Sequence, residues 1–304
     1  MSEIPSHARV VIVGAGIVGN ALAWHLARLG WRDIVQVDKG PLPNPGGSTG
    51  HASSFTFAVD HSRQTTTWTM DSIREFEALG VFTRTGGIEI ARTEERMHEL
   101  RRRMGLAKAW GVETELLDPA GVNALMPYLD HSKILGGFHT PAVGVVDPLH
   151  AGTLYREKAI ATGALRTFAN TEVTGLDVHD GRITGVSTTR GHVDAEVVVV
   201  CGGIWSRKVA AMAGATIPLV PAVHQIVDIG PVPEFEALDN PLAYPVIRDM
   251  DAKMYARQSG SDLEVGSYAH ESLPVQPEDI PSNDQALMSP TELPFTSEHF
   301  DPYI

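Results

Sequence analysis

Short apolar runs and helical periodicity alternate in the first forty residues. Residues 10–13 form a β-branched run, residues 20–29 repeat Ala and Leu at helical spacing, and residues 33–38 form a second short apolar run. The glycine-rich segment 14–19 joins the first run to the helix, and Gly30 stands where a helix-ending glycine is expected. The pattern predicts a strand, a turn, a helix and a strand within the ~30 residues of a βαβ unit.

The middle of the chain predicts helices that flank short strands. Helical spacing covers about residues 65–79 and 94–109, and the segment GGIEIAR between them is typical of a strand. Asp118-Pro119 and Asp147-Pro148 each place an N-cap residue before a proline at the first helical position. We therefore expect a short helix after Asp118 and a longer helix from Asp147 to about residue 162.

The following region predicts mostly strands. Asp180-Gly181 lies between two alternating runs and indicates a hairpin turn. The run AEVVVV at residues 195–200 is typical of a strand that is buried on both faces. Further strands are expected at about 218–229, 253–258 and 262–267, before a segment rich in proline and polar residues.

These elements predict an α/β fold (α+β overall), with a parallel sheet in which three strands are clear. We expect a Rossmann-like dinucleotide-binding domain at residues 8–60 and 140–215. A β-sheet-rich substrate-binding domain, at residues 61–139 and 216–304, would be interleaved with it.

Composition excludes several classes of function. The 304 residues carry 24 Lys and Arg against 37 Asp and Glu, so the formal net charge is −13, which argues against a nucleic-acid partner. No segment reaches the ~18–20 apolar residues of a membrane helix. The single Cys201 fits a reducing compartment and is interpreted as a small buried apolar residue. The histidines lack metal-ligand spacing. We therefore expect a cytoplasmic protein with no metal site and no membrane partner.

The glycine-rich turn indicates a dinucleotide site. Gly14 permits the tight turn, Gly16 lets the backbone approach a pyrophosphate, and Gly19 lets the helix pack closely on the strand. The helix N-terminus then offers its free N–H groups to phosphates. Asp38, at the end of the next strand, would accept hydrogen bonds from a ribose diol. The alternative is a glycine-rich turn that binds no ligand.

The loop that follows favours FAD over a nicotinamide cofactor. The segment KGPLPNPGGSTGHAS is long and rich in small and hydroxyl residues, which suits an extended cofactor, with Ser48 and Thr49 near its pyrophosphate or ribityl chain. The diglycine turn that begins at Gly202 is a second place where the backbone can touch the cofactor. A nicotinamide-dependent dehydrogenase would use the same turn but leaves His51, in the centre of the loop, unexplained.

Several segments together resemble a known family. They are VVIVGAGIVGNALAWHLARLGW, VDKGPLPNPGGSTGHAS, TGGIEIART, GVVDP, VVVVCGGIWS and PAVHQIV. They are similar to glycine-oxidase-like FAD-dependent oxidoreductases of the D-amino acid oxidase superfamily, above all the dimethylglycine and sarcosine oxidases and dehydrogenases. The resemblance implies FAD as the cofactor and a covalent bond from His51 to the flavin 8α carbon. The alternative is that His51 only forms hydrogen bonds within its loop.

The resemblance also implies a reaction and an electron acceptor. Such enzymes oxidise an N-methyl amine of glycine, either dimethylglycine or sarcosine, by hydride transfer to the flavin, which oxygen or an electron-transfer flavoprotein reoxidises. His224 is then the base or a proton relay and Tyr255 its partner at the amine, against the alternatives of a core histidine and ordinary strand packing. Arg248 and Arg257 are candidates for the substrate carboxylate, and either could instead be a surface ion-pair residue.

The predicted cofactor contacts extend beyond the glycine turn. By resemblance, the backbone of Val173 lies near the adenine. The full set of expected FAD-binding residues is Gly14, Gly16, Ile17, Val18, Gly19, Asp38, Lys39, Ser48, Thr49, His51, Val173, Gly202 and Trp205.

The resemblance fails near the end of the chain. The family's FAD domain closes with a glycine-rich strand, turn and helix, and nothing after Gly266 matches that segment. The ending FTSEHFDPYI is typical of the opening of a helix. We therefore expect the C-terminal FAD segment to be missing. The alternative function is an inactive or partial FAD-binding fragment, or a subunit that needs a C-terminal partner segment.

Overall fold

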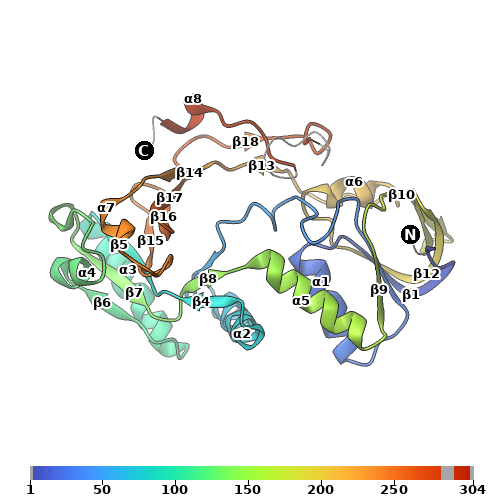
Figure 1. The fold of residues 1–304 in the computed structure, drawn as a ribbon, viewed down its shortest axis with the longest axis horizontal. Coiled ribbons are helices and arrows are strands. Elements are labelled where there is room, and N and C mark those ends of the chain that lie inside the picture. The colour runs from blue at the N-terminus through green and yellow to red at the C-terminus, as the bar shows by residue number, and fades with distance from the viewer. Residues whose placement is uncertain (1–2, 282–290, 302–304) are drawn as a thin grey trace. The chain divides into compact units, whose positions relative to one another are not determined.

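The computed structural model describes residues 3–281 and 291–301 and divides the chain into two units. Unit 1 comprises Met1–Ser53, Asp147–Val223 and Pro274–Pro294, and unit 2 comprises Ser54–Val146, His224–Leu273 and Phe295–Ile304. Each unit is therefore built from three separate stretches of chain, and in Figure 1 each unit contains ribbon of several different colours.

Unit 1 contains one large sheet and the helices that pack on it. Its elements are β1 (His7–Val13), α1 (Ile17–Arg28), β2 (Ile34–Val37), α5 (Pro148–Ala161), β9 (Leu165–Phe168), β10 (Val173–His179), β11 (Arg182–Thr188), β12 (Gly191–Val200), the 3-10 helix η2 (Gly203–Trp205), α6 (Ser206–Ala211) and β13 (Ala222–Val223). The short β13 pairs with β18 (Leu273–Pro274) where the chain crosses between the units.

The six strands of this sheet lie in the order β10-β11-β12-β1-β2-β9. The last four run parallel, and β10 and β11 are antiparallel additions at one edge. Ala23 and Ala27 of α1 and Ala159 of α5 pack with Val10 and Ile12 of β1 in one core cluster. A second cluster, which includes Val209 of α6, contains the alternate residues of β1. The predicted α/β class is confirmed, and β9 raises the parallel strands from three to four.

Local signals in unit 1 behave as their chemistry requires. Gly30 has φ 88° at the end of α1, and the Asp147 side chain accepts the backbone N–H of His150 to cap α5. The hairpin between β10 and β11 turns at Asp180-Gly181, as predicted. The expectation that residues 197–200 are buried on both faces is wrong, because Val197 is 40% exposed.

Unit 2 contains two sheets and several helices. Its elements are β3 (Phe55–Thr56), α2 (Arg63–Leu79), β4 (Phe82–Arg84), β5 (Gly87–Ala91), α3 (Glu94–Ala109), β6 (Glu115–Leu117), α4 (Pro119–Leu125), η1 (His131–Lys133), β7 (Gly136–Thr140), β8 (Gly144–Val146), β14 (Ile226–Ile229), α7 (Pro233–Glu236), β15 (Val246–Asp249), β16 (Met254–Ser259), β17 (Asp262–Ser267) and α8 (Ser297–Phe300).

The larger sheet of unit 2 has the strand order β14-β17-β16-β15-β5-β7-β6, and the smaller has the order β3-β8-β4. Alternate residues of the larger sheet, such as Ile88 and Ile247, pack with Val122 of α4 in an apolar cluster. The opposite face carries Glu89 and Ala91 on β5, and Ala91 packs with Leu100 of α3. The two faces of this sheet therefore differ in polarity.

Register places Glu89, Arg248, Tyr255 and Gly266 in one row across that second face. Glu89 is opposite Arg248 in the β5–β15 pair, Arg248 is opposite Tyr255, and Tyr255 is opposite Gly266. Side chains opposite one another on neighbouring strands lie within contact range. The row therefore joins residues separated by as many as 177 positions in the sequence.

Candidate functional site

The turn between β1 and α1 brings three backbone segments together. Gly14 has φ 114°, and a Cβ atom there would lie 2.3 Å from the carbonyl oxygen of Cys201. A Cβ atom at Gly19 would lie 2.0 Å from the carbonyl oxygen of Gly14. Helix α1 has Gly16 as its N-cap, with no side-chain cap hydrogen bond. Such a helix terminus presents N–H groups and a partial positive charge, which suits a phosphate group.

Asp38 follows β2 and faces the same turn. Its Oδ2 accepts the N–H of Ala15 at 2.7 Å, and its Oδ1 accepts the N–H of Gly40 at 2.7 Å. Burial raises the pKa of this carboxyl group, and the two backbone hydrogen bonds oppose that shift. Each oxygen keeps a further lone pair. The carboxylate is therefore fixed in orientation and can still accept ligand hydroxyl groups.

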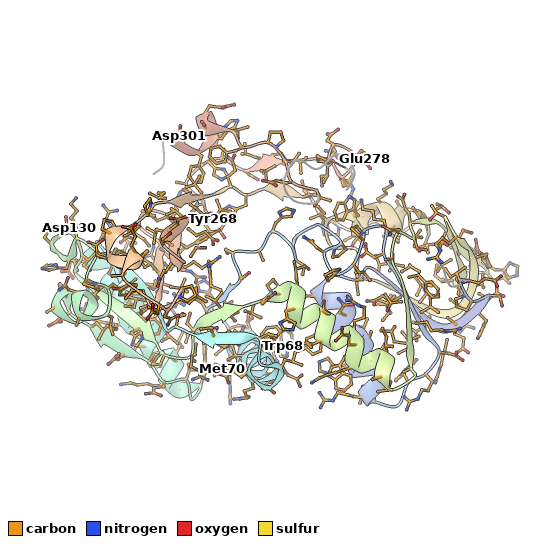
Figure 2. All side chains as sticks on the ribbon, viewed as in Figure 1. Trp68, Met70, Asp130, Tyr268, Glu278 and Asp301 are labelled. Carbon is orange, nitrogen blue, oxygen red and sulfur yellow. The ribbon has the colours of Figure 1, made fainter. Side chains whose placement is uncertain are left out.

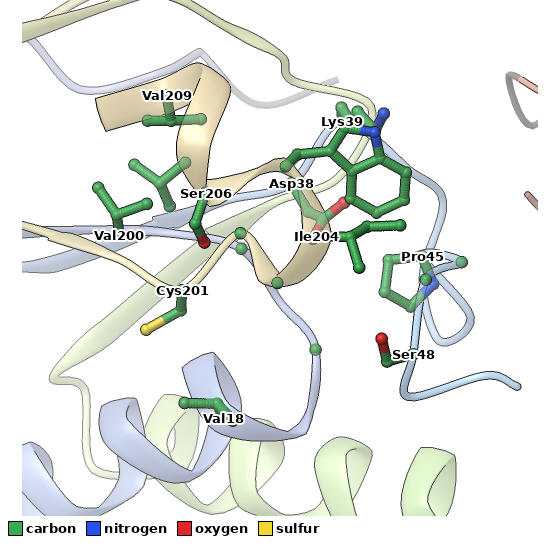
Figure 3. A pocket seen from close by; sticks show the side chains of 18 of the residues that line it. Val18, Asp38, Lys39, Pro45, Ser48, Val200, Cys201, Ile204, Ser206 and Val209 are labelled. Atoms are coloured by element: carbon green, nitrogen blue, oxygen red, sulfur yellow. The ribbon is translucent and has the colours of Figure 1, made fainter. Parts of the chain in front are cut away.

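A cavity of about 730 Å³ lies in front of this turn, entirely within unit 1 (Figure 3). The volume falls in the range of ~300–1,000 Å³ typical of cofactor and small-molecule sites. All the cofactor-binding residues predicted from the sequence line it except Gly19 and His51. Gly19 instead packs inside the turn. Other residues that line the cavity, among them Thr171, Glu172 and Val220, were not predicted because they belong to no sequence motif.

Lys39 and Trp205 lie together at this cavity. The Lys39 Nζ atom lies 3.7 Å from the centre of the Trp205 ring, a cation–π distance. Burial lowers the pKa of Lys39, whereas nearby Glu172 raises it. A Cβ atom at Gly47 would lie 3.0 Å from the same ring, so glycine allows the loop to approach the indole closely.

The loop that carries His51 is tied to unit 1 at two points. The Ile17 N–H donates to Thr49 Oγ1 at 3.1 Å, and the Gly47 N–H donates to Thr291 Oγ1 at 2.8 Å. His51 Nε2 lies 3.4 Å from the same Thr291 oxygen. Thr291 belongs to the segment 274–294 of unit 1 and was not singled out by the sequence analysis.

A hydrogen-bonded pair in unit 2 joins the two predicted catalytic residues. His224 Nε2 lies 2.8 Å from Tyr255 Oη. The Tyr255 side chain crosses Gly266, where a Cβ atom would lie 2.3 Å from Oη, and Tyr255 is only 2% exposed. Burial lowers the pKa of His224 below its ordinary value of 6.5, and neighbouring His270 lowers it further. A neutral imidazole is therefore favoured at this position.

Tyr268 extends this aromatic group. It directly follows β17 (Figure 2) and stacks on His224, with ring centres 4.4 Å apart and an interplanar angle of 14°. Phe55 contacts Tyr255 edge to face at 4.7 Å. Tyr268 is 58% exposed, so one part of the group is buried and another part is accessible. Neither Tyr268 nor Phe55 was predicted from the sequence.

The two candidate arginines have different surroundings. Arg257 is bound to Glu264: its Nη2 lies 2.5 Å from Oε2, and its Nε donates to Oε1 at 3.0 Å. The guanidinium carbon of Arg248 lies 4.0 Å from the centre of the Phe57 ring, and its Nη1 lies 3.9 Å from Glu89 Oε2. Within residues 3–281 and 291–301, no hydrogen bond from the Arg248 guanidinium is found.

Glu89 is already bound by another cation. Arg103 Nη1 lies 2.5 Å from both Glu89 oxygens, and Arg103 Nη2 donates to the carbonyl oxygen of Val59 at 2.8 Å. Glu89 is 1% exposed and Arg103 is 6% exposed. One buried carboxylate thus faces two guanidinium groups. The Arg248 charge also interacts with the Asp60 carboxylate.

Among the described residues, no group of three or more His, Cys, Asp or Glu side chains is placed to hold a metal ion. In the same part of the chain, no helix is long and apolar enough to cross a membrane.

Most of the chain is similar to one family of known proteins. The family described as "FAD dependent oxidoreductase" matches residues 9–291. The chain is 32% identical over 283 residues to the mitochondrial sarcosine dehydrogenase of Mus musculus, which covers 87% of this chain and 29% of that protein. It is 33% identical over 273 residues to the mitochondrial dimethylglycine dehydrogenase of Rattus norvegicus, with 88% of this chain and 31% of that protein covered.

A bacterial relative covers more of the chain. The 4-methylaminobutanoate oxidase (formaldehyde-forming) of Paenarthrobacter nicotinovorans is 32% identical over 313 residues, with 98% of this chain and 36% of that protein covered. The chain thus spans about a third of the length of these relatives.

Solved structures support the fold. L-proline dehydrogenase from P. horikoshii superposes with a TM-score of 0.80 at 24% identity, covering 93% of this chain and 75% of that chain. Glycine oxidase from Geobacillus kaustophilus gives a TM-score of 0.68 at 22% identity, covering 89% and 72%. At these identities the likeness establishes the fold and nothing finer.

Proposed function

This chain belongs to the FAD-dependent oxidoreductase family, and we propose that it oxidises an N-methylated glycine, dimethylglycine or sarcosine. The observation that carries the proposal is the coexistence of the cofactor cavity in unit 1 with the His224–Tyr255 pair in unit 2. The names of the relatives support the substrate class. We assign FAD binding to unit 1, which contains most of residues 8–60 and 140–215, and substrate binding to unit 2, which contains most of residues 61–139 and 216–304 but not 274–294.

The residues of the unit 1 cavity fit FAD. A side chain at Gly14 or Gly19 would collide with backbone oxygens, so the turn stays open to a phosphate group. The N-terminus of α1 would hold the pyrophosphate, and Asp38 would accept the ribose hydroxyls. Ser48 and Thr49 would line the path of the ribityl chain, and Val173 would lie near the adenine.

We propose that His51 forms the covalent bond to the flavin. Its loop lines the cavity through Ser48, Thr49 and Ala52, so His51 belongs to a segment in contact with the cofactor space. Gly47 lets the loop approach the Trp205 ring, and a Cβ atom at Gly50 would lie 2.6 Å from Asn44 Oδ1, so both glycines allow the loop to pack closely. A neutral imidazole is a competent nucleophile. This attachment would hold the cofactor in the cavity permanently.

In the proposed reaction, His224 and Tyr255 prepare the amine. His224 takes the proton of the substrate ammonium through the Tyr255 hydroxyl, because an amine with a free lone pair can release a hydride from its methyl carbon. FAD supplies the hydride acceptor. The resulting iminium ion adds water and releases formaldehyde and the demethylated amine. Dioxygen or an electron-transfer flavoprotein then takes up the two electrons.

Arg248, rather than Arg257, is the better candidate for the substrate carboxylate. Glu264 occupies Arg257 with two hydrogen bonds, whereas Glu89 is occupied by Arg103 and lies 3.9 Å from Arg248, which forms no hydrogen bond from its guanidinium among the described residues. A partly buried cation without full compensation attracts an anion. Arg248 is also opposite Tyr255 in the sheet, so a bound carboxylate would lie beside the amine-binding pair.

Anaerobic reduction of the flavin tests this proposal most simply. We expect dimethylglycine or sarcosine to bleach the flavin absorbance of the protein in a stopped-flow experiment. One molecule of formaldehyde should appear for each flavin that is reduced. Betaine, which has no ammonium proton and no lone pair on nitrogen, serves as a matched control and should leave the flavin oxidised. Bleaching by neither methylated glycine would refute the proposed function.

A further inference from the structure

Thr291 adopts an unusual backbone conformation close to His51. Its φ is 67°, in the left-handed region that β-branched residues rarely occupy. It is also 7% exposed, so the surrounding residues enclose it. A strained conformation of this kind persists only where other contacts hold it, and such positions are frequent at functional sites. The contacts that hold Thr291 in this conformation therefore point to a functional role for its side chain.

The Thr291 hydroxyl connects two parts of the His51 loop. Its oxygen accepts the Gly47 N–H at 2.8 Å and lies 3.4 Å from His51 Nε2. A threonine hydroxyl offers one hydrogen and two lone pairs. One lone pair is used by Gly47, so the hydrogen and the second lone pair are available to the imidazole. Either arrangement restricts the direction of the ring.

We infer that Thr291 is a positioning residue that orients the His51 imidazole for covalent attachment of the flavin. The inference rests on the proposed covalent link. Thr291 comes from a segment 240 residues away and reaches the loop within unit 1, so the loop and the orienting hydroxyl are supplied by different parts of the chain. The Gly47 hydrogen bond holds the hydroxyl in place, and the contact with Nε2 limits rotation of the ring.

In the attachment step, a bond forms between a ring nitrogen of His51 and the 8α methyl carbon of FAD. The nitrogen loses its proton, the methyl group loses one proton, and the two electrons of the broken C–H bond stay on the flavin. Dioxygen or an electron-transfer protein then accepts those electrons. Thr291 exchanges no atoms in this step; it aligns the nucleophile.

Two substitutions at this position separate orientation from packing. Thr291→Val keeps the branched shape and removes the hydroxyl, whereas Thr291→Ser keeps the hydroxyl. The apoprotein is mixed with FAD, precipitated with acid at intervals, and the covalent fraction is read from the intact mass. Loss of one hydrogen bond of ordinary strength predicts attachment about 3- to 10-fold slower in Thr291→Val. Thr291→Ser should stay within about twofold of the unchanged protein.

A second background excludes a role in holding the loop alone. In a His51→Ala protein, where no bond can form, Thr291→Val removes only the tie to Gly47, so the dissociation constant of FAD should change by a smaller factor than the attachment rate does. An equal loss of FAD affinity in that background would overturn the inference, because Thr291 would then act on the loop and not on His51. Equal attachment rates for Thr291→Val and the unchanged protein would also overturn it. Absence of covalent flavin in the unchanged protein would instead refute the proposed link itself.

Discussion

The two units assemble their functional groups in different ways. In unit 1, the turn at Gly14–Gly19 and Asp38 lie within one βαβ unit and act largely through backbone atoms. In unit 2, Glu89, Arg248 and Tyr255 meet only because three strands pair in a particular register. A cofactor common to a whole family can be bound by a local motif. The groups that we propose bind the amine depend on side chains that long-range pairing brings together.

This difference predicts how each region responds to substitution. Changes in unit 2 should alter the reaction with methylated amines and leave FAD binding intact, whereas changes at the unit 1 turn should alter FAD binding first.

Tyr255→Phe is expected to have the largest effect on turnover. It removes the hydroxyl that is hydrogen-bonded to His224 but keeps the ring that packs on Phe55. Loss of a proton-transfer group reduces rates by about 10²- to 10⁴-fold. Stopped-flow flavin reduction by dimethylglycine measures the change. The matched control is Tyr244→Phe, which lies in another aromatic cluster with Tyr128 and Phe235. If Tyr255→Phe turned over at the unchanged rate, the unit 2 site would be misassigned.

Arg248→Met should follow, with a weaker effect that is confined to substrate binding. Methionine can still pack on Phe57, and Glu89 keeps its bonds to Arg103. Loss of a charge-assisted hydrogen bond of about 1.5–3 kcal/mol predicts a rise in KM of roughly 10- to 100-fold. Calorimetric titration with methoxyacetate, which has the carboxylate but no amine, provides a readout that does not need turnover.

Arg257→Gln is the control for that experiment, since Arg257 lies on the neighbouring strand and is bound to Glu264. Its removal should change KM by less than about threefold, although the protein should lose some thermal stability because Glu264 keeps a buried charge without its partner. If Arg257→Gln weakened methoxyacetate binding more than Arg248→Met, the assignment of the carboxylate site would be reversed.

Asp38→Ala tests unit 1 and should leave the amine reaction chemistry unchanged. The substitution removes the acceptor proposed for the ribose hydroxyls and leaves the N–H groups of Ala15 and Gly40 without their partner. In a His51→Ala background, where binding is reversible, we expect a rise of about tenfold in the FAD dissociation constant, equal to about 1.4 kcal/mol. Fluorescence quenching of FAD measures it. A rise in KM for the amine without loss of FAD affinity would contradict the separation of the units.

The pH dependence should show the smallest but most specific change. Burial lowers the pKa of His224, so the residue stays neutral to a lower pH than an exposed histidine. Because the proposed base must be neutral, the His224-dependent acid limb of flavin reduction should have its midpoint below 6.5, with the rate rising as the pH increases. The same shift makes the folded state bind fewer protons than the unfolded state, so stability falls as the pH drops through this range. A midpoint above 6.5 would argue against His224 as the base.

Much of unit 1 could be predicted from the sequence because its signals are local. The glycine turn, the cap at Asp147 and the hairpin at Asp180-Gly181 each depend on residues within a few positions of one another, as does the cap at Asp118 in unit 2. Strands β9 (LRTF) and β15 (VIRD) were not predicted because four residues are too few to show an alternating pattern.

The contacts around the site could not be predicted because they depend on tertiary pairing. The Glu89–Arg103 ion pair joins a strand to the following helix, and the contact between His51 and Thr291 spans 240 residues. Tyr268 follows β17 without a motif, yet it stacks on His224. Single-sequence patterns report periodicity and local chemistry, and they do not report which distant side chains meet.

The intact mass of the protein after incubation with FAD tests whether unit 1 binds FAD and carries it on His51. The protein is incubated with FAD, denatured in acid, and its mass is compared with that of the His51→Ala variant treated in the same way. We expect the unchanged protein to gain the mass of one FAD molecule less two hydrogen atoms and His51→Ala to gain none. An adduct of the same mass on both proteins, or on neither, would contradict the proposed attachment of FAD to His51.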